Sequence, residues 1–585
     1  MITIGFYKGH NATACLLRDG QIIAAVSEER FNRIKNADVF PKMAINYCLK
    51  KAGVSPQEVD LYVRIYEHPE GYVSPEGETK SPKLMEALLY PSKYVSHLIF
   101  IFPELGFFLK RSFAFISGNF LSYFFQKQFK VNMAKFLNID DKKIVFANHH
   151  LCHAYSAYYG FVPEEDQKKD QLVITLDGEG DNLCGSVWTV KKGQWKKISE
   201  TLGGNSIAAF YGLVTHFLGM KMNEHEYKVM GLAPYVSQYE IDKVYPLFEG
   251  LFWVDDNLTM HSKYPSGSYL QYFDKYLSHK RFDSIAGAAQ LFVENLIVDL
   301  VNKSIKKTDI KNIVLSGGFF MNIKGNKKIA DIKEVEHLVV CPSAGDESAP
   351  FGGAYFGYQI LCEESSKDFL PENISNLYLG PDYSSEQIEG VIKREKHFKI
   401  KKFSDIEKEI AKLLKLGKIV GRFKGRMEWG ARALGNRSIL MDPSRVDLKR
   451  ELNEQVKSRD FWMPFAASIL SERQKDYVVN PKNIKAMYMS IGFDTTQKGK
   501  KDLAAAVHPY DYTCRPQIVT NEQNPDYYKL IKYFEKLTGI GALLNTSFNY
   551  HGEPIVCSPA DAFNTFKLTG LKYLALGNYL ITKDE

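Results

Sequence analysis

Leu172–Asn182 reads LVITLDGEGDN, an apolar run that ends abruptly in glycine and acidic residues. A run of this kind predicts a buried β-strand, followed by a loop of the type that commonly carries function. Two further apolar runs meet across Lys191–Gly193, which predicts a β-hairpin. The start of the chain has the same plan, because an apolar run leads into the loop Gly5–Asn11 and then into a hairpin across Asp19-Gly20.

Two tandem copies of strand, loop and hairpin predict a duplicated α/β domain with a cleft between its halves, as in the actin-like ATPases. Asn312–Asn326 (NIVLSGGFFMNIKGN) adds a buried strand and a Gly-Gly turn, where backbone N–H groups can cradle an anion. His337–Gly353 adds another strand that ends in a glycine- and aspartate-containing loop. The polar stretch Cys362–Asn376 is expected to end this domain, giving domains at 1–370 and 371–585.

Composition is that of a soluble globular protein, with 45% hydrophobic and 24% charged residues among 585. The net charge of +7 permits contact with nucleic acid but does not favour it. The eight cysteines form no CxxC pair, and no secretory signal pattern opens the chain, so we expect a cytoplasmic protein. The aromatic segment Leu84–Phe129 contains no run of about 20 apolar residues, so buried helices are expected there; a substrate- or membrane-facing lobe is the alternative.

A candidate metal site begins in Lys143–Gly160, where a strand pattern runs into a helix pattern with His149 and His153 four residues apart. This spacing puts both rings on one helical face, a geometry that chelates divalent metals. Core histidines satisfied by hydrogen bonds are the alternative. Asp177 and Asp346, both at predicted strand ends, are candidate carboxylate ligands, and turn capping is the alternative for each.

The later part of the chain carries a basic stretch, Gly425–Leu440 (GRMEWGARALGNRSIL), with Arg432 and Arg437 among its arginines. Lys457 and Arg459 follow shortly after it. So many cations repel one another unless an anion lies among them, which indicates a pocket for a phosphorylated small molecule. A solvated basic loop is the alternative, but the interleaved apolar residues disfavour it.

Two more stretches are expected to join that pocket. Arg515 lies in YTCRPQIV, and an apolar strand in Ile540–Cys557 ends at Ser547 and Asn549. Ser547 has no GxSxG context, so a hydrogen-bonding role is favoured over a nucleophilic one. His10, in the first loop, is either a turn histidine or a functional residue, as a base or a ligand-binding group.

Ten stretches of the sequence, in order and over nearly the whole chain, resemble the O-carbamoyltransferase family that includes nodulation-factor, cephem and tobramycin carbamoyltransferases. They are GHNA (9–12), SEERFNRIK (27–35), NHHLCHA (148–154), LDGEGD (176–181), EYKVMGLAPY (226–235), LSGGFFMN (315–322), AGDESAPFGGA (344–354), RMEWGARALGNRS (426–438), NEQVKSRDFWMPF (453–465) and LNTSFN (544–549).

This resemblance implies a duplicated actin-like (ASKHA, Kae1-like) domain for metal binding and carbamoyl transfer, followed by an α/β YrdC-like domain. It also implies that carbamoyl phosphate and ATP form carbamoyl adenylate, whose carbamoyl group passes to a hydroxyl of a sugar, antibiotic or glycan. The aromatic segment hints at an apolar or glycan acceptor. A homodimer is compatible with the resemblance.

Site residues follow from the same resemblance. The metal, with Fe²⁺ favoured over Mn²⁺, Mg²⁺ and Zn²⁺, would bind to His149, His153, Asp177 and Asp346, and His10 would be the general base. The family loop usually reads Gly-His-Asp, but here it is Gly9-His10-Asn11, which puts the strength of that base in doubt. Arg432 and Lys457 would be catalytic, and the remaining substrate- and nucleotide-binding residues would be Lys228, Gly317, Gly318, Asn322, Arg437, Arg459, Arg515, Ser547 and Asn549.

Two other functions remain open at this point. A tRNA threonylcarbamoylation factor shares the HxxxH segment, although the modest net charge and the Arg-rich element count against it. A non-catalytic, actin-like nucleotide-binding module would require the cations of the second domain to be idle.

Overall fold

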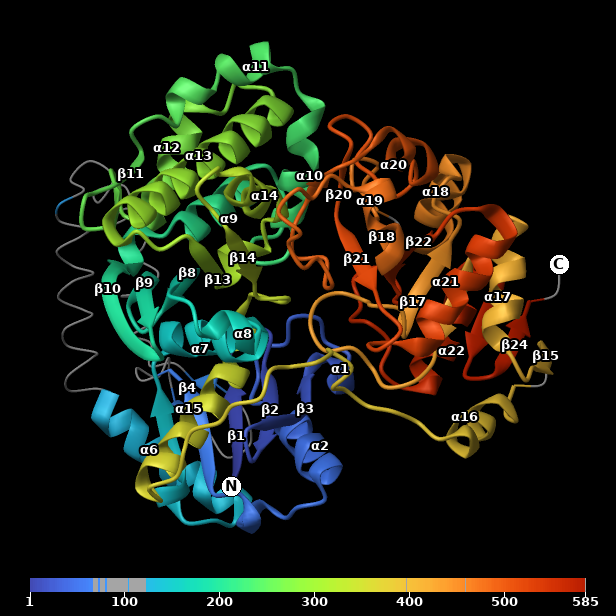
Figure 1. The fold of residues 1–585 in the computed structure, drawn as a ribbon, viewed down its shortest axis with the longest axis horizontal. Helices are drawn as coiled ribbons and strands as arrows, with labels where there is room; N and C mark the ends of the chain where they lie inside the picture. Colours follow the sequence, from blue (N-terminus) through green and yellow to red (C-terminus); the bar gives the residue numbers. More distant parts are fainter. Residues whose placement is uncertain are drawn as a thin grey trace. The chain divides into compact units, whose positions relative to one another are not determined.

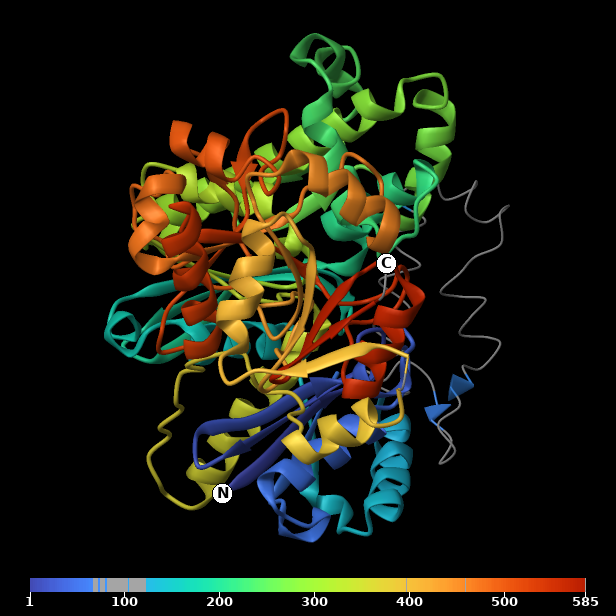
Figure 2. The same cartoon turned by 90° about the vertical axis from the view of Figure 1, so that its right-hand side faces the viewer.

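The computed structural model describes residues 1–66, 72–73, 79–80, 104, 122–395, 397–457 and 459–583. They form two compact units (Figures 1 and 2). Unit 1 contains Met1–Ala24 and Asp38–Ile374, and unit 2 contains Ala25–Ala37 and Ser375–Glu585. The sequence-based division at 370/371 lies close to the later break but does not include the early segment of unit 2. Most of the aromatic segment lies outside the described residues, so its expected helices stay a prediction.

Two five-stranded sheets of the same topology form the frame of unit 1. In each, an antiparallel hairpin flanks three parallel strands. The tandem strand–loop–hairpin pattern therefore produces two matching α/β halves. The first sheet has the order β3 (Gln21–Ser27), β2 (Thr13–Arg18), β1 (Ile2–Tyr7), β4 (Leu61–Ile65), β7 (Ile144–Ala147), and the second has β10 (Gln194–Leu202), β9 (Leu183–Lys191), β8 (Gln171–Gly180), β13 (Asn312–Ser316), β14 (His337–Val340).

Helix α15 (Ala349–Glu364) lies directly on the first sheet and beside α7 (His149–Phe161) (Figure 1). Glycines allow this close approach. A Cβ on Gly5 of β1 would lie 1.9 Å from the carbonyl oxygen of Pro350, and one on Gly352 would lie 1.8 Å from that of Cys152. Both values are far below van der Waals contact, so no other residue fits at either position without moving the helix.

The remaining helices and strands of unit 1 surround the two sheets. Among the described residues, only α13 is long and apolar enough to cross a membrane, and 78% of its apolar stretch is buried, as in the core helix of a folded domain. These elements are α2 (Lys42–Ala52), β5 (Tyr72–Val73), β6 (Thr79–Lys80), α6 (Ser122–Leu137), α8 (Glu164–Gln167), α9 (Ile207–Phe217), α10 (Glu226–Leu232), α11 (Gln238–Asp242), β11 (Phe252–Val254), β12 (Met260–Ser262), α12 (Tyr269–Tyr276), α13 (Phe282–Thr308) and α14 (Ile323–Asp331).

Unit 2 is built on one mixed eight-stranded sheet. Its order is β15 (Lys399–Lys402), β24 (Tyr579–Thr582), β23 (Tyr573–Leu576), β16 (Val420–Phe423), β17 (Arg437–Met441), β22 (Ala542–Ser547), β18 (Ala466–Leu470), β21 (Pro516–Val519). The other elements are α1 (Glu29–Asn32), α16 (Ser385–Ile392), α17 (Ile406–Lys415), α18 (Val446–Leu452), α19 (Gln474–Tyr477), β19 (Phe493–Asp494), α20 (Gln497–Asp502), β20 (Thr513–Cys514), α21 (Pro525–Thr538) and α22 (Pro559–Leu568).

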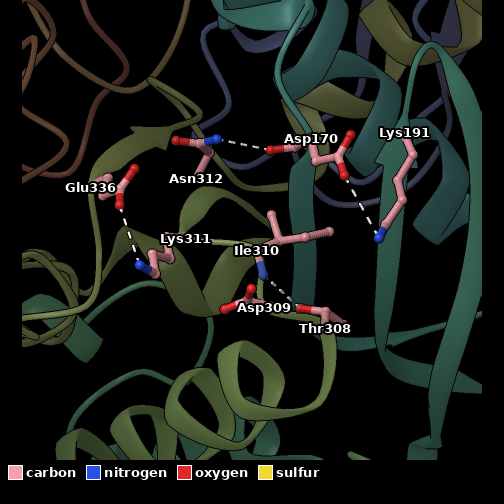
Figure 3. Close-up of a pocket in the computed structure, with 8 residues that line it drawn as sticks. All are labelled: Asp170, Lys191, Thr308, Asp309, Ile310, Lys311, Asn312 and Glu336. Atoms are coloured by element: carbon pink, nitrogen blue, oxygen red, sulfur yellow. Dashed lines mark hydrogen bonds and ion pairs between the residues drawn. The ribbon is translucent and has the colours of Figure 1, made fainter.

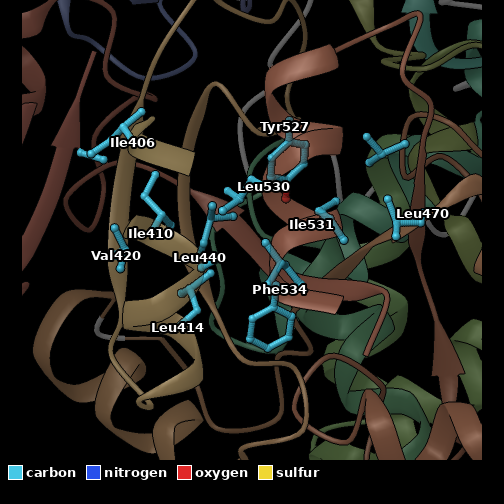
Figure 4. Close-up of a cluster of buried hydrophobic side chains, with 14 residues drawn as sticks. Ile406, Ile410, Leu414, Val420, Leu440, Leu470, Tyr527, Leu530, Ile531 and Phe534 are labelled. Carbon is cyan, nitrogen blue, oxygen red and sulfur yellow. The ribbon is translucent and has the colours of Figure 1, made fainter. Parts of the chain in front are cut away.

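The core of unit 2 lies between the sheet and the paired helices α17 and α21 (Figure 4). Ile410 and Leu414 of α17 and Phe534 of α21 are fully buried against Val420 and Leu440 of the central strands. Each buried side chain of this size contributes about 1.5–3 kcal/mol through the apolar area removed from water. This core fixes the strands whose ends carry the basic residues of unit 2.

Candidate metal centre and anion site

Two histidines and two aspartates of unit 1 converge on one point. His149 and His153 come from the first two turns of α7, Asp177 from β8, and Asp346 from the turn after β14. Their ligand atoms all lie within 4.8 Å of one another. The two Nε2 atoms are 3.1 Å apart, and Asp177 Oδ2 lies 3.0 Å from that of His149. Asp346 Oδ1 lies 3.5 Å from both ring nitrogens.

The local sequence explains why these groups meet. Asn148 caps α7 by accepting a hydrogen bond from the N–H of Leu151 (3.1 Å), so the helix starts immediately after β7. His149 and His153 then lie one turn apart on one face. Asp346 follows the carboxyl end of β14, and Asp177 lies in the last part of β8, beyond its parallel pairing with β13, where loops and functional groups gather in α/β sheets.

The donor set fits a divalent transition metal. Two imidazole nitrogens and two carboxylate oxygens are ligands of Fe, Mn and Zn, whereas Mg²⁺ prefers oxygen alone. Asp346 Oδ1 is buried and has no hydrogen-bond partner among the described residues, which is costly unless a cation lies beside it. Surrounding groups orient the ligands: His153 Nδ1 lies 3.3 Å from the hydroxyl of Ser348, and Asp177 Oδ1 accepts the N–H of Gly318 at 2.8 Å.

The histidines and aspartates of the cluster also shift one another's pKa values. Burial opposes a proton on His149, but the hydrogen bond to Asp177 and the charge of Asp346 raise its pKa to about 9. Burial also opposes ionisation of Asp177, but the two histidines lower the pKa of that carboxyl well below its usual value. In the absence of a metal, the cluster therefore balances its charge as histidine–carboxylate pairs.

The third histidine of the segment, His150, has a different environment. Its Nδ1 lies 2.8 Å from the hydroxyl of Thr175, and its Nε2 lies 3.0 Å from the carbonyl oxygen of Leu183. Burial and the neighbouring histidines lower its pKa to about 3, so it is neutral. The alternative of a core histidine satisfied by hydrogen bonds therefore applies to His150.

His10 lies in the loop after β1, next to this cluster. Its Nδ1 is 3.4 Å from Asp346 Oδ2, and its side chain is 42% exposed. Burial opposes a proton on His10, but Asp346 and the acidic groups near it outweigh burial and raise the pKa of His10. Asn11 adopts the left-handed conformation (φ 67°) and donates to Glu347 at 3.5 Å. An acid for His10 is thus available from Asp346, although position 11 has none.

The structure places the expected nucleotide residues of unit 1 as follows. Gly317 has φ +99°, and a Cβ there would lie 2.2 Å from the carbonyl oxygen of Leu176, so this turn packs against β8 and orients Asp177 through Gly318. Asn322 caps α14, because its Oδ1 accepts the N–H of Gly325 (3.0 Å). Lys228 is half-buried on α10, whose first residue, Glu226, lies near enough for the charge of His10 to act on its pKa.

Unit 2 contains a cluster of like charges. Burial and the charges of Arg432 and Arg459 lower the pKa of Arg515 well below its usual value. Burial, Arg459 and Lys35 do the same to Lys457. These shifts place the five cations near one another, and a cationic cluster of this kind is the electrostatic environment of an anion.

Lys457 is held at the end of β22. Its Nζ donates to Asn549 Oδ1 at 2.8 Å and to the hydroxyl and carbonyl oxygens of Ser547. The hydroxyl of Ser547 also donates to Asn549 Oδ1, at 2.7 Å. Among the described residues, the hydrogen-bond partners of the ammonium are neutral oxygens, which do not balance its charge.

Arg437 differs from the other arginines of its segment. It is fully buried on β17 and donates to the carbonyl oxygens of Lys424 (3.2 Å), Gly425 (3.1 Å) and Pro381 (3.3 Å). Its guanidinium also lies 3.7 Å from the centre of the Phe423 ring. The structure thus gives Arg437 a role in shaping the loop, and its expected contact with an anion stays a prediction.

Sequence reasoning missed two residues of this site. Lys35 comes from the early segment of unit 2, and only its place in the SEERFNRIK motif singled it out. Glu428, the one acid of Gly425–Leu440, is buried and accepts the N–H groups of Leu434 (2.6 Å) and Arg437 (3.1 Å). A single acid among glycines and arginines was the signal for a residue that closes the loop on itself.

A separate hollow of about 400 Å³ lies in unit 1, lined by residues at the amino ends of β8, β13 and β14 (Figure 3). The metal cluster follows the carboxyl ends of these strands. Four of the charged side chains that line the hollow form pairs, with Lys191 Nζ 3.6 Å from Asp170 and Lys311 Nζ 3.5 Å from Glu336, and Asp309 adds a third acid. The hollow therefore mixes acidic and basic groups, in contrast with the like charges of the cluster in unit 2.

Comparison with known proteins identifies the family of this chain. The chain matches family models described as Carbamoyltransferase N-terminus over residues 2–355 and Carbamoyltransferase C-terminus over residues 411–583. These matches define a transferase. The chain belongs to the carbamoyltransferase family, which confirms the resemblance seen in its motifs.

Two relatives and one solved structure illustrate the match. An uncharacterized protein of Synechocystis sp. is 31% identical, over 98% of this chain and 95% of its own length. Nodulation protein NolNO of Sinorhizobium fredii is 30% identical, over 98% of this chain and 79% of its own length. Component A of the (R)-2-hydroxyglutaryl-CoA dehydratase of Acidaminococcus fermentans is 11% identical with a TM-score of 0.33, over 62% of this chain and 98% of that one; a score this low supports no conclusion.

Proposed function

We propose that this chain is an O-carbamoyltransferase that makes carbamoyl adenylate in unit 2, its YrdC-like part, and transfers the carbamoyl group in unit 1, its actin-like part. Carbamoyl phosphate and water give carbamate and phosphate; a carbamate oxygen then bonds to the α-phosphorus of ATP and displaces pyrophosphate. An acceptor oxygen finally bonds to the carbamoyl carbon and displaces AMP. The group of like charges formed by Arg432, Lys457, Arg459 and Arg515 in a carbamoyltransferase chain carries this proposal.

In unit 2, the cations bind and orient phosphates. An anion among Arg432, Arg459 and Arg515 would remove the repulsion that lowers the pKa of Arg515. Lys457, fixed by Ser547 and Asn549, would place one charge on a phosphate oxygen and stabilise the negative charge that develops as pyrophosphate leaves. Arg437 and Glu428 would hold the loop that presents Arg432.

In unit 1, His149, His153, Asp177 and Asp346 would hold a divalent metal, for which Fe²⁺ is our first choice. When bound, such an ion supplies a Lewis acid that polarises the phosphoryl or carbamoyl oxygen. His10 Nδ1 can donate to Asp346 Oδ2, which leaves Nε2 as the base that takes the proton of the acceptor hydroxyl. Asp346 would thus use one oxygen for the ion and the other to orient the base.

The experiment is to measure AMP and pyrophosphate release from ATP in metal-supplemented buffer, with and without carbamoyl phosphate and with no acceptor. We expect pyrophosphate release that requires carbamoyl phosphate, and a loss of at least about 100-fold in Arg432→Ala. Arg445→Ala is the matched control, because Arg445 is an exposed arginine of unit 2 paired with Asp447. Release that ignores carbamoyl phosphate would contradict the proposal, as would full activity of Arg432→Ala.

The same preparation separates the two alternatives. A tRNA threonylcarbamoylation factor would bind tRNA tightly and with strong dependence on salt. A non-catalytic nucleotide-binding module would keep its function in a Lys457→Ala, Arg515→Ala double variant. The acceptor is then sought among sugars, antibiotics and glycans, by the appearance of a carbamate ester on the hydroxyl.

A further inference from the structure

The strap, defined as Ala25–Ala37, is part of unit 2 although it lies near the start of the chain. Its first residue donates its N–H to the carbonyl oxygen of Leu379 (3.3 Å). Phe31 packs against a small buried cluster that includes Met427, Ala433 and Ile555. These residues belong to the Arg-rich loop and to the segment after β22, so the strap lies against both parts of the anion site.

Arg30 connects the strap to the loop that carries Arg432. It is 5% exposed, and its Nη2 donates to the carbonyl oxygen of Gly430 at 2.8 Å. Its Nη1 lies 2.6 Å from Glu29 Oε1, so its charge is paired within the strap. A buried, charge-assisted hydrogen bond two residues before Arg432 restricts the backbone that presents that guanidinium.

Arg33 connects the strap to the loop that carries Asn549. Its Nη1 donates to the carbonyl oxygen of Ile555 (2.7 Å) and its Nη2 to that of Pro554 (2.8 Å). The next residue back, Glu553, uses its own carbonyl oxygen to accept the side-chain amide of Asn549 at 2.8 Å. Arg33 therefore fixes the loop through which Asn549 holds Lys457.

Hydrogen bonds within the strap fix its backbone around Arg33. Arg33 ends helix α1 in the left-handed conformation (φ 61°), and its N–H donates to the carbonyl oxygen of Glu29 at 3.1 Å. The carboxylate of Glu29 accepts the N–H of Asn36 at 2.7 Å and closes the turn that follows. Glycine is the usual residue at such a helix end, because the left-handed conformation is unfavourable for residues with a Cβ. Arg33 adopts it nonetheless, and its side chain reaches the loop after β22.

We propose that the strap is a positioning element of the anion site, in which Arg30 and Arg33 each hold one of the two loops that carry its cations. The inference rests on the proposed function for the identity of the anion, a nucleotide or carbamoyl phosphate. It assigns to the strap the alignment of Arg432 with Lys457. Unit 2 thus completes its phosphate site with a segment that precedes most of unit 1 in the chain.

The test is the binding of inorganic pyrophosphate to the full chain, by titration calorimetry and by the rise in Tm. Arg33→Ala is expected to weaken binding about tenfold, because loss of a charge-assisted contact that orders the site costs about that factor in affinity. Arg33→Lys should restore part of the affinity, and Arg445→Ala should bind as the wild type does. In the pyrophosphate-release assay, KM for ATP should rise in Arg33→Ala more than kcat falls.

Three results would overturn the inference. One is wild-type affinity in Arg33→Ala together with a lowered Tm, which means that the strap only stabilises the fold. Another is a wild-type chain that does not bind pyrophosphate at all. If Arg33→Ala does not fold, Arg33→Lys is compared with the wild type, and equal affinity is the third. Pyrophosphate binding without carbamoyl-phosphate-dependent pyrophosphate release from ATP would instead refute the proposed function and leave the strap in place.

Discussion

The two candidate sites of this chain differ in how their charges are arranged. In unit 1, acids and histidines are mixed, so the cluster of His149, His153, Asp177 and Asp346 is balanced before any ligand arrives. In unit 2, charges of one sign gather, and the pKa values of Lys457 and Arg515 fall because burial and the neighbouring cations both oppose a positive charge there. The first site is organised by its own side chains, whereas the second is organised by a backbone framework that holds repelling groups until an anion binds.

Removing one metal ligand should have the largest effect and should leave the other site intact. We expect His153→Ala to lose bound metal and carbamoyl transfer by at least about 100-fold, since even surrounding residues of metal sites change affinity by 10–100-fold. Pyrophosphate release in unit 2 should persist. Metal content by elemental analysis and the two assays check this, with His216→Ala, an exposed histidine, as control. Loss of both activities together would deny that the sites are separable.

Two arginines of unit 2 should fail in different ways. Arg437→Ala should lower the free energy of unfolding by about 3 kcal/mol, because it leaves buried carbonyl oxygens without donors. Arg515→Ala removes one of several repelling charges, so it should change stability by less than about 1 kcal/mol while abolishing pyrophosphate binding. Urea unfolding and calorimetry measure both quantities. The reverse pattern would show that Arg437 is the binding group.

Anion binding in unit 2 should take up a proton. The folded-state pKa of Lys457 is lowered, so below the usual lysine value of about 10.4 part of the population is neutral in the free protein. A bound pyrophosphate raises that pKa again, and affinity should therefore fall as pH rises through the lowered pKa. Calorimetry in buffers of different ionisation enthalpy should show uptake of up to about one proton, which Lys457→Gln abolishes. An unchanged proton count in that variant would assign the uptake elsewhere.

The same shift affects the stability of the free protein. Between the lowered pKa of Lys457 and its usual value of about 10.4, the unfolded chain binds more protons than the folded one, so stability rises with pH in this window. Lys457→Gln should flatten the rise. Urea unfolding at several pH values checks it, and a slope that survives the substitution would point to the other cations.

The smallest effect is expected at position 11. Asn11→Asp restores the usual acid of the family loop, but His10 already lies 3.4 Å from Asp346. We therefore expect carbamoyl transfer within about threefold of the wild type, with a loss of stability of about 1 kcal/mol because a second carboxylate would face Glu347. A large gain in rate would show that Asp346 is fully engaged elsewhere.

Local sequence patterns were sufficient to predict much of unit 1. The strand–loop–hairpin repeats predicted the matching sheets, and the i, i+4 spacing together with strand ends predicted the residues of the metal cluster, because both signals depend on near neighbours in the chain. Arg432 and Arg437 look alike in sequence, and only the pairing of β17 inside a sheet turns one of them inward. The strap could not be predicted, since its place depends on contacts with residues some 400 positions away.

The strap also imposes an order on synthesis. Ala25–Ala37 leaves the ribosome early, but the segments that it contacts in unit 2 follow only after more than 300 further residues. At typical rates of translation this delay is roughly 15 to 70 s. During that time Phe31 and the two arginines lack the segments of unit 2 that they contact in the folded protein. Unit 2 can therefore be completed only after its later segments have been synthesised, although one of its parts is among the first made.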